Sequence, residues 1–247
     1  MAGGGIISTE KNGWRLQWKD DGTDYPALLE EFISGRLTGR SLSTGSSFRE
    51  VWRVEAGGRV FVIKRDWEID RRLEKRLWEK LGGTPYQRLI RLTNRAVGRG
   101  CPVVQDVYLV AENISGGRWS EAWLIAEFVE GDSLILEFQD GAPARFLDIA
   151  QWIGPMSETI AELHDYGLAS NDLHPGQFVI SQTGLKVIDL SLDSPILVCQ
   201  VNDALTFRHF FKVVPPMRSW RRRALFRLMS LGRRFKNFKR KILKRKK

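Results

Sequence analysis

The stretch GLASNDLHPGQFVI at residues 167–180, followed by KVIDLS at 186–191, constrains the fold of this chain more than any other feature. It places a carboxylate, an imidazole, a proline and a glycine between a helix-like segment and two short apolar runs. These runs, with a Thr-Gly turn between them, predict a β-hairpin. A second carboxylate, Asp189, directly follows the second run, so the hairpin would set its separation from Asp172 in the loop.

The part of the chain that precedes this loop is dominated by strand patterns. Two β-rich runs at residues 51–54 and 59–64 are joined by Ala-Gly-Gly, which is a hairpin signal. Residues 66–97 predict helix with a break at a Gly-Gly pair, and two further strands are expected within 103–112 and 119–131. The first half is therefore expected to consist of strands around a helical insertion.

The second half of the chain changes to helical patterns. Residues 149–167 have helical periodicity that ends at a glycine, and the segment after the hairpin is mostly helical. The sequence therefore predicts an α+β fold with a sheet-rich lobe and a helical lobe that holds one small hairpin. The expected parts are an N-terminal extension or covering segment at 1–37, the sheet-rich lobe at 38–130, the helical lobe at 131–216 and a basic tail at 217–247.

The segment LASNDLHPGQFVI…LKVIDLS resembles the catalytic loop and the metal-binding loop of the protein-kinase-like fold, in the Asp-x-His-x-Gly-Asn variant seen in small-molecule and sugar kinases. Within that superfamily the chain is most similar to the lipopolysaccharide core heptose kinases, bacterial enzymes that phosphorylate a heptose of the inner core. The block PYQRLIRLTNRAV…DVYLVAE and the basic C-terminus fit that family as well. The resemblance implies a two-lobed protein-kinase-like fold, with ATP and Mg²⁺ as cofactors.

The resemblance also assigns roles to individual side chains. Phosphoryl transfer needs a carboxylate that accepts or orients the acceptor hydroxyl, a cation that holds the phosphates, and oxygen ligands for Mg²⁺. Asp172 takes the first role, and Lys64 at the end of VFVIK takes the second. Asp189 takes the metal role at the end of an apolar strand. His174 is expected to brace the loop.

Two further nucleotide contacts are expected. A helical side chain should pair with Lys64; Gln87 stands at the aligned position, and Glu79 or Glu74 on the preceding helix are the alternatives. In LIAEFVEG, the backbone from Glu127 to Val129 should pair with adenine as an additional strand edge would. The apolar Leu-Ile pair of the same segment would form the wall of the adenine pocket.

The chain departs from the family pattern at two places. The second metal ligand is usually Asn, but Gln177 stands there; its carbonyl oxygen could ligate Mg²⁺ directly or through water. The segment TGRSLSTGSSF, with Gly39 and Gly45, supplies hydroxyl and backbone N–H groups that can cap phosphates, but it contains no GxGxxG. An inert or merely nucleotide-binding relative is therefore the alternative to a working kinase.

The positive charge of the chain is concentrated in the C-terminal tail. Of 39 Lys and Arg, fifteen lie within 218–247, where no acidic residue occurs, which leaves 24 basic against 29 acidic side chains in the rest. One helical face is apolar and consists of Trp220, Ala224, Leu228, Leu231, Phe235, Phe238 and Ile242. The pattern favours a helix that lies on an anionic membrane surface. Nucleic acid is the less favoured partner, and packing of the Trp220–Leu231 part on the helical lobe is also expected.

Other features bear on the compartment. No stretch is long and apolar enough for a membrane span, and the N-terminus lacks the layout of a signal peptide, so a cytoplasmic location peripheral to the inner membrane is expected. Cys101 and Cys199 indicate neither a disulfide framework nor a zinc site, and both are expected to be buried.

The leading hypothesis from the sequence is an ATP-dependent kinase for a heptose of the lipopolysaccharide inner core. A cationic tail would raise its local concentration where the anionic acceptor is embedded. The alternatives are a protein Ser/Thr kinase, which the short segment after Asp189 disfavours, and a non-catalytic module tethered to membrane or RNA.

Overall fold

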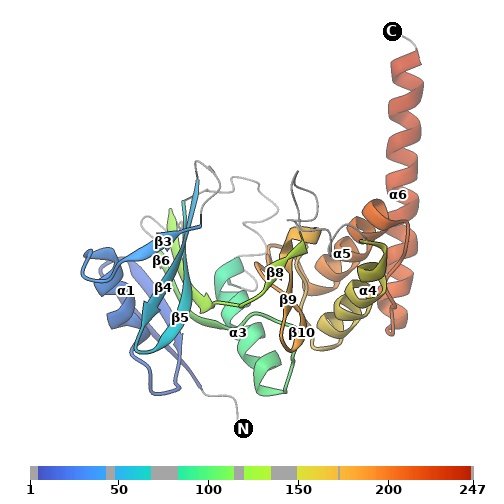
Figure 1. The fold of residues 1–247 in the computed structure, drawn as a ribbon. Coiled ribbons are helices and arrows are strands. Elements are labelled where there is room, and N and C mark those ends of the chain that lie inside the picture. The colour runs from blue at the N-terminus through green and yellow to red at the C-terminus, as the bar shows by residue number, and fades with distance from the viewer. Residues whose placement is uncertain are drawn as a thin grey trace.

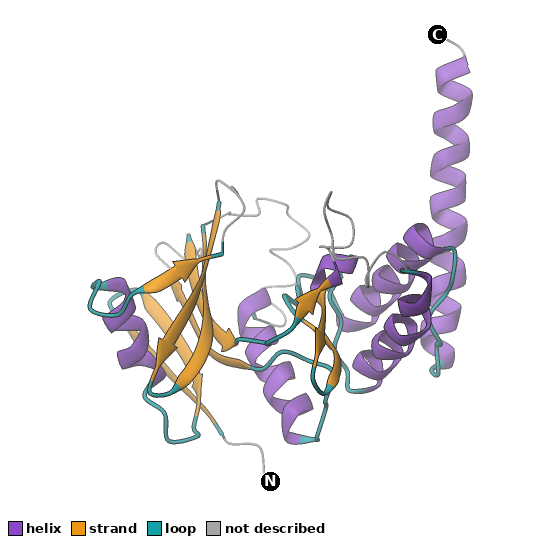
Figure 2. Cartoon of the chain, viewed as in Figure 1, coloured by secondary structure: helices purple, strands orange, loops and turns teal. Residues whose placement is uncertain are grey.

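The computed structural model describes residues 5–42, 48–67, 83–113, 120–134, 149–171 and 173–245, with side chains up to residue 233. Several expectations fall outside these ranges and concern Gly45, Glu74, Glu79, Asp172 and the helix over 68–82. In the described part, the expected α+β fold is confirmed, because a sheet-rich lobe precedes a helical lobe with a small sheet of its own (Figure 2).

The first lobe is built on one seven-stranded antiparallel sheet with the order β1-β2-β6-β7-β5-β4-β3. Its strands are β1 (Ile6–Lys11), β2 (Trp14–Lys19), β3 (Gly39–Ser41), β4 (Arg49–Ala56), β5 (Arg59–Asp66), β6 (Val107–Asn113) and β7 (Glu121–Glu127). The predicted hairpin at Gly57-Gly58 is confirmed, since β4 and β5 pair in register from Arg49–Asp66 to Ala56–Arg59.

The two faces of this sheet are covered by different helices. Alternate residues of the strands, such as Phe61 and Ile63, pack with Tyr25 and Leu29 of α1 (Tyr25–Ile33). The other face packs against α3 (Pro85–Gly98) and continues into the core of the second lobe. Figure 1 shows α1 and α3 on opposite sides of the strands. Because one apolar core runs through both lobes, their relative position is set by packing.

The N-terminal segment does more than cover the body. Strand β2 pairs with β6 from Trp14–Asn113 to Trp18–Leu109, and β1 pairs with β2, so the sheet begins at Ile6. The expected lobe boundary at residue 38 therefore does not coincide with an edge of the sheet. The turn of this hairpin is Asn12-Gly13, where both residues have positive φ. An Asn-Gly pair is a strong hairpin signal, which the expectation of a covering segment does not take into account.

The second lobe combines a three-stranded sheet with helices. The sheet has the order β10-β9-β8, and the predicted hairpin of β9 (Phe178–Ser181) and β10 (Gly184–Val187) is confirmed. The remaining elements are β8 (Asp132–Ser133), α4 (Ala150–Asp165), the short 3₁₀ helix η4 (Pro175–Gln177), α5 (Ile196–Phe211) and α6 (Trp220–Arg245). Gly131 makes the entry into this lobe possible, because a Cβ there would lie 2.1 Å from the carbonyl oxygen of Ile180.

The predicted tail helix is present as α6, whose C-terminal end projects from the body (Figure 1). Its start is held by Asp165, which accepts from Arg222 at 2.8 Å and from Arg218 at 2.6 Å. The expectation that the apolar stripe packs on the helical lobe is wrong: Trp220, Leu228 and Leu231 are 68%, 67% and 51% exposed. A different face, which includes the buried Arg222 and Ser230, is turned to the body.

No helix in the described part of the chain has the length and apolar character needed to cross a membrane.

Candidate active site

The structure brings two of the predicted site residues together across the lobes. The Lys64 Nζ atom lies 3.0 Å from Asp189 Oδ1. Lys64 is the sixth residue of β5, and because Ile63 points into the core under α1, Lys64 points to the opposite face. Asp189 follows β10 by two residues and has a φ of 58°, a left-handed conformation that is costly for a residue other than glycine. The strand ends thus bring the cation and the carboxylate to the junction of the lobes.

Asp189 belongs to a small network of charges. Arg49 Nη1 lies 3.5 Å from Asp189 Oδ2, and Arg49 Nη2 donates to Asp66 Oδ2 at 3.0 Å. Tyr86, from the first turn of α3, donates its hydroxyl to the same oxygen of Asp66 at 2.8 Å. The Lys64 ammonium lowers the pKa of the Asp189 carboxyl against the opposing effect of burial, and Arg49 adds to the lowering. Asp189 is therefore an anion at neutral pH, as a metal ligand must be.

Sequence reasoning did not find Arg49, Asp66 and Tyr86. Arg49 and Asp66 are opposite each other in the β4–β5 register, so the hairpin itself contained the signal for that pair. Burial raises the pKa of the Tyr86 hydroxyl, which keeps it a donor to Asp66.

Gln87 does not pair with Lys64. Its backbone N–H donates to Thr84 Oγ1 at 3.1 Å, and its Oε1 accepts from the Thr84 N–H at 3.3 Å. These two bonds form a capping box at the start of α3. The Gln87 side chain, which was expected to pair with Lys64, thus caps the start of α3. Its neighbour Tyr86 instead contacts the charged network through Asp66.

The loop that contains Asp172 is anchored on its N-terminal side. The Ser170 N–H donates to Asp203 Oδ2 of α5 at 2.9 Å, and His164 Nε2 of α4 lies 3.1 Å from the same oxygen. Asp203 is completely buried, and burial raises the pKa of its carboxyl while the bond with His164 opposes that rise. Asn171, with a φ of 67°, donates to Asp193 at 2.5 Å. The backbone that leads into position 172 is therefore tied to both helices.

Gln177 braces the loop in a way that its predicted metal role did not anticipate. Its Oε1 accepts from Ser170 Oγ at 3.0 Å and from the His174 N–H at 3.2 Å, and its Nε2 donates to the Asp189 carbonyl at 2.9 Å. An amide oxygen has two lone pairs, so in this arrangement neither is left for Mg²⁺. Gln177 instead joins the two functional loops, and His174 contributes to the brace through its backbone.

In the connection between the lobes, only part of the backbone that was predicted to pair with adenine is free of hydrogen bonds within the protein. The Glu127 N–H donates to the Asp106 carbonyl at 2.9 Å, and the Glu127 carbonyl accepts from Gln105 Nε2 at 2.7 Å, so both groups are used. In the described part of the chain, the N–H and C=O of Val129 make no hydrogen bond. Of Glu127 and Val129, Val129 is thus the residue whose backbone groups are open, and its pairing with adenine stays a prediction.

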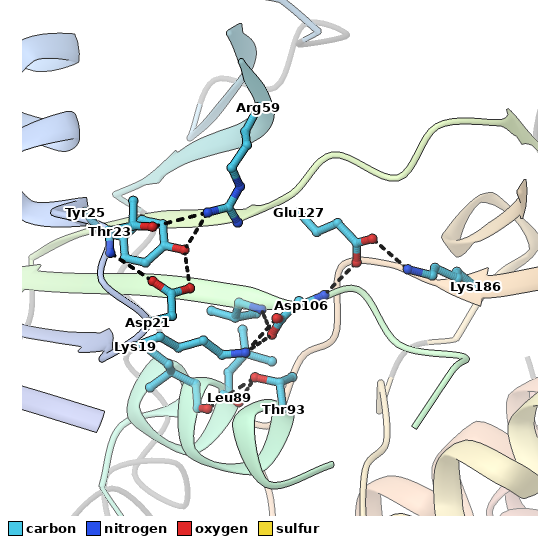
Figure 3. Close-up of polar contacts among 12 residues, drawn as sticks. Lys19, Asp21, Thr23, Tyr25, Arg59, Leu89, Thr93, Asp106, Glu127 and Lys186 are labelled. Carbon is cyan, nitrogen blue, oxygen red and sulfur yellow. Dashed lines mark hydrogen bonds and ion pairs between the residues drawn. The ribbon is translucent and has the colours of Figure 1, made fainter. Parts of the chain in front are cut away.

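Charged side chains link this connection to the neighbouring strands, as Figure 3 shows. Glu127 Oε1 accepts from Lys186 of β10 at 2.6 Å, and Glu127 Oε2 accepts from the Asp106 N–H at 3.1 Å. Lys19 of β2 in turn lies 2.6 Å from Asp106. The Glu127 side chain thus links the lobes, a role that the sequence did not indicate.

The described residues fit a nucleotide-bound Mg²⁺ better than a metal held by protein alone. They contain no group of three or more His, Cys, Asp or Glu side chains that could hold a metal ion. Mg²⁺ in kinase sites is commonly held by one or two carboxylates together with substrate phosphates. Asp189 supplies one such carboxylate with a 41% exposed side chain, beside two cations that suit phosphates.

Comparison with known proteins agrees with this geometry. The family described as "Lipopolysaccharide core biosynthesis protein (WaaY)" matches residues 6–245. A protein of Escherichia coli named lipopolysaccharide core heptose(II) kinase WaaY is 26% identical over 186 residues, which cover 75% of this chain and 77% of the relative. The protein of the same name from Escherichia coli strain K12 is 24% identical and covers 70% of this chain and 71% of the relative.

Solved structures are more distant. The structure described as "WaaP in complex with acyl carrier protein" is 16% identical with a TM-score of 0.47, over 80% of this chain and 79% of that one. The PknI kinase domain of Mycobacterium tuberculosis is 19% identical with a TM-score of 0.46, over 74% of this chain and 77% of the other.

Proposed function

Because the chain belongs to the lipopolysaccharide core biosynthesis protein (WaaY) family, we propose that it is an ATP-dependent kinase for a heptose of the lipopolysaccharide inner core. The relatives that carry the name heptose(II) kinase act on a sugar hydroxyl. The observation that carries the proposal from the structure is the 3.0 Å pair between Lys64 and Asp189, which joins a strand of one lobe to a loop of the other.

The residues take the following roles in this proposal. Lys64 and Arg49 neutralise the phosphates of ATP, and Asp189 contributes a carboxylate oxygen to Mg²⁺, which stabilises the charge on the phosphates. The N–H and C=O of Val129 pair with adenine. The oxygen of the heptose hydroxyl attacks the γ-phosphorus, the bond between that phosphorus and the ADP oxygen breaks, and Asp172 accepts the hydroxyl proton.

Transfer of labelled phosphate from ATP to core oligosaccharide tests these assignments. Asp172→Ala and Asp189→Asn should each reduce kcat by about 10³-fold or more, because each removes a group that acts in the transition state. The exposed Asp20→Asn is the matched control and should transfer at the native rate. Native rates in either site variant would reject the assignment.

The acceptor is identified by mass spectrometry of core oligosaccharide from cells with and without the protein. Loss of one phosphate from a heptose is the expected difference. An unchanged core together with a changed set of phosphorylated proteins would instead favour the protein kinase alternative.

We further propose that α6 holds the protein at the cytoplasmic face of the inner membrane. Its exposed Trp220, Leu228 and Leu231 lie on a helix whose Lys and Arg attract anionic lipid, at about 1 kcal/mol for each cation near the surface. The native chain should sediment together with vesicles that contain anionic lipid. The double variant Leu228→Gln/Leu231→Gln should sediment with them less. Ile33→Gln on α1, which is also exposed, is the control. Equal sedimentation of all three proteins would refute the anchor.

A further inference from the structure

A cavity of about 290 Å³ lies between α3 and the segment that follows Asp189, and no role has been assigned to it. It is lined by Arg88, Arg91, Leu92 and Arg95 from α3 and by Leu192, Ser194, Pro195 and Ile196 from the other side. We call it the arginine pocket. None of these lining residues is acidic, and three of them carry guanidinium groups; the Nε of Arg91 donates to the Gln87 carbonyl of its own helix.

The three arginines lie on one face of α3. Their spacing of three and then four residues brings their side chains next to one another along the helix. The planar guanidinium group forms paired hydrogen bonds with phosphate and carboxylate oxygens, which makes this arrangement suited to an oxyanion.

The opposite wall adds backbone donors. Helix α5 begins there without a side-chain cap, and the N–H groups of Val198 and Cys199 both donate to the Pro195 carbonyl. In the described part of the chain, the N–H groups of Ile196 and Leu197 have no hydrogen-bond acceptor. The start of a helix carries partial positive charge, and here it meets the arginine face. Two independent features of the pocket therefore favour a negative ligand.

The pocket shares its walls with the candidate active site. Leu192 follows Asp189 by three residues, and the neighbouring Asp193 accepts from Asn171, the residue before position 172. On the other wall, Tyr86 at the start of α3 reaches the charged network through Asp66. The pocket wall is thus connected through Asp193 and Asn171 to the loop that contains position 172.

We infer that the arginine pocket is an oxyanion subsite of the acceptor, which binds a phosphate or carboxylate carried by a sugar next to the heptose that is phosphorylated. This inference rests on the proposed function. It assigns Arg91 and Arg95 to acceptor recognition and leaves ATP binding unaffected by them.

The test measures acceptor kinetics of a double variant of the pocket, Arg91→Gln/Arg95→Gln, in which both replaced residues are exposed. The control is the double variant Arg36→Gln/Lys11→Gln, which removes the same charge at exposed positions elsewhere. The pocket variant should raise the KM for core oligosaccharide by roughly 10- to 100-fold with an unchanged KM for ATP, because charge-assisted bonds to the acceptor are lost. The control should match the native enzyme. An unchanged KM for the core, or an equal rise for ATP, would overturn the inference.

One further acceptor and one small-molecule probe identify the anion. With core treated with phosphatase, a smaller effect of the variant assigns the pocket to an acceptor phosphate, and an equal effect assigns it to a carboxylate. Inorganic phosphate is the remaining probe: if it stabilises the native chain but not the variant against heat, while the KM for the core is the same in both, the pocket binds free phosphate and the acceptor role is wrong.

Binding of the core measured by calorimetry separates this inference from the proposed function. If the native chain binds the core without phosphorylating it and the pocket variant binds it less, the subsite stands and the kinase assignment fails. If the native chain does not bind the core at all, the subsite is wrong.

Discussion

Asp189 carries the largest share of the proposed chemistry, and its ionisation depends on its neighbours. Lys64 lowers the pKa of the Asp189 carboxyl, while burial acts in the opposite direction. Because the folded-state pKa is below the unfolded value of about 3.9, the pair stabilises the fold fully above that pH. The stabilisation is lost as the pH falls through the lower, folded-state pKa.

Lys64→Met should therefore raise the pKa of the Asp189 carboxyl, which ¹³C NMR of the carboxyl carbon would measure. The free energy of unfolding should differ between native and variant proteins at pH 7, and the difference should shrink as the pH falls below about 3.9 and through the folded-state pKa. Lys11→Met at an exposed position is the control for the loss of one cation. A native pKa in the Lys64→Met protein would contradict the assigned cause of the shift.

The connection between the lobes depends on the close approach of two elements. Gly131 has a φ of 148°, and a side chain there would meet the backbone of β9. A backbone atom cannot move aside as the end of a flexible side chain can, so the position accepts only glycine. This explains how β8 can begin directly after the connection and pair with Ile180 and Val179.

Gly131→Ala should lower the free energy of unfolding by about 3 kcal/mol or more, because both the backbone conformation and the space exclude a Cβ. Gly232→Ala is the matched control, since nothing lies within 4 Å of a Cβ at that position inside α6. It should stabilise the protein by about 0.5–1 kcal/mol, through the higher helix propensity of alanine. Urea unfolding followed by circular dichroism measures both, and equal stabilities would contradict this account.

At the scale of the whole molecule, Gln105 connects the parts that must act together. Its Nε2 donates to the Glu127 carbonyl at 2.7 Å, and its Oε1 accepts from the Asp189 N–H at 3.3 Å. One buried side chain thus connects the segment that contains Glu127 to the loop that contains Asp189. Its own backbone N–H donates to the Val187 carbonyl of the hairpin, which fixes it to the second lobe.

Gln105→Leu should leave two partly buried backbone groups without their present partners, at a cost of up to about 1–3 kcal/mol for each. Because these groups belong to both sides of the nucleotide site, the Kd for ATP should rise as well. Gln151→Leu, at an exposed position of α4, should change neither quantity. Calorimetric titration with MgATP and chemical unfolding measure the two effects; a stability loss with an unchanged Kd would limit Gln105 to a structural role.

Local patterns in the sequence were sufficient for most elements of the fold. The hairpins of β4–β5 and β9–β10, the helices α3, α4 and α6, and the order of the two lobes follow from periodicity and turn residues that act over a few positions. The same patterns placed Lys64 and Asp189 at strand ends, and the contact between them is present.

Long-range contacts decided what local patterns could not. Gln177 has a side-chain amide that suits a brace or a metal ligand equally well, and its bonds to Ser170 and to the Asp189 carbonyl, which the fold brings next to it, make it a brace. The capping box of Gln87 with Thr84 is by contrast a local contact over three residues. The exposed stripe of α6 was ambiguous as well, because a helix has several faces that can pack. By itself, the sequence determined the elements, their order and the charged groups at their ends. Only the tertiary structure decided which polar atoms remain open to a ligand, because hydrogen bonds between distant segments use up donors and acceptors that no local pattern records.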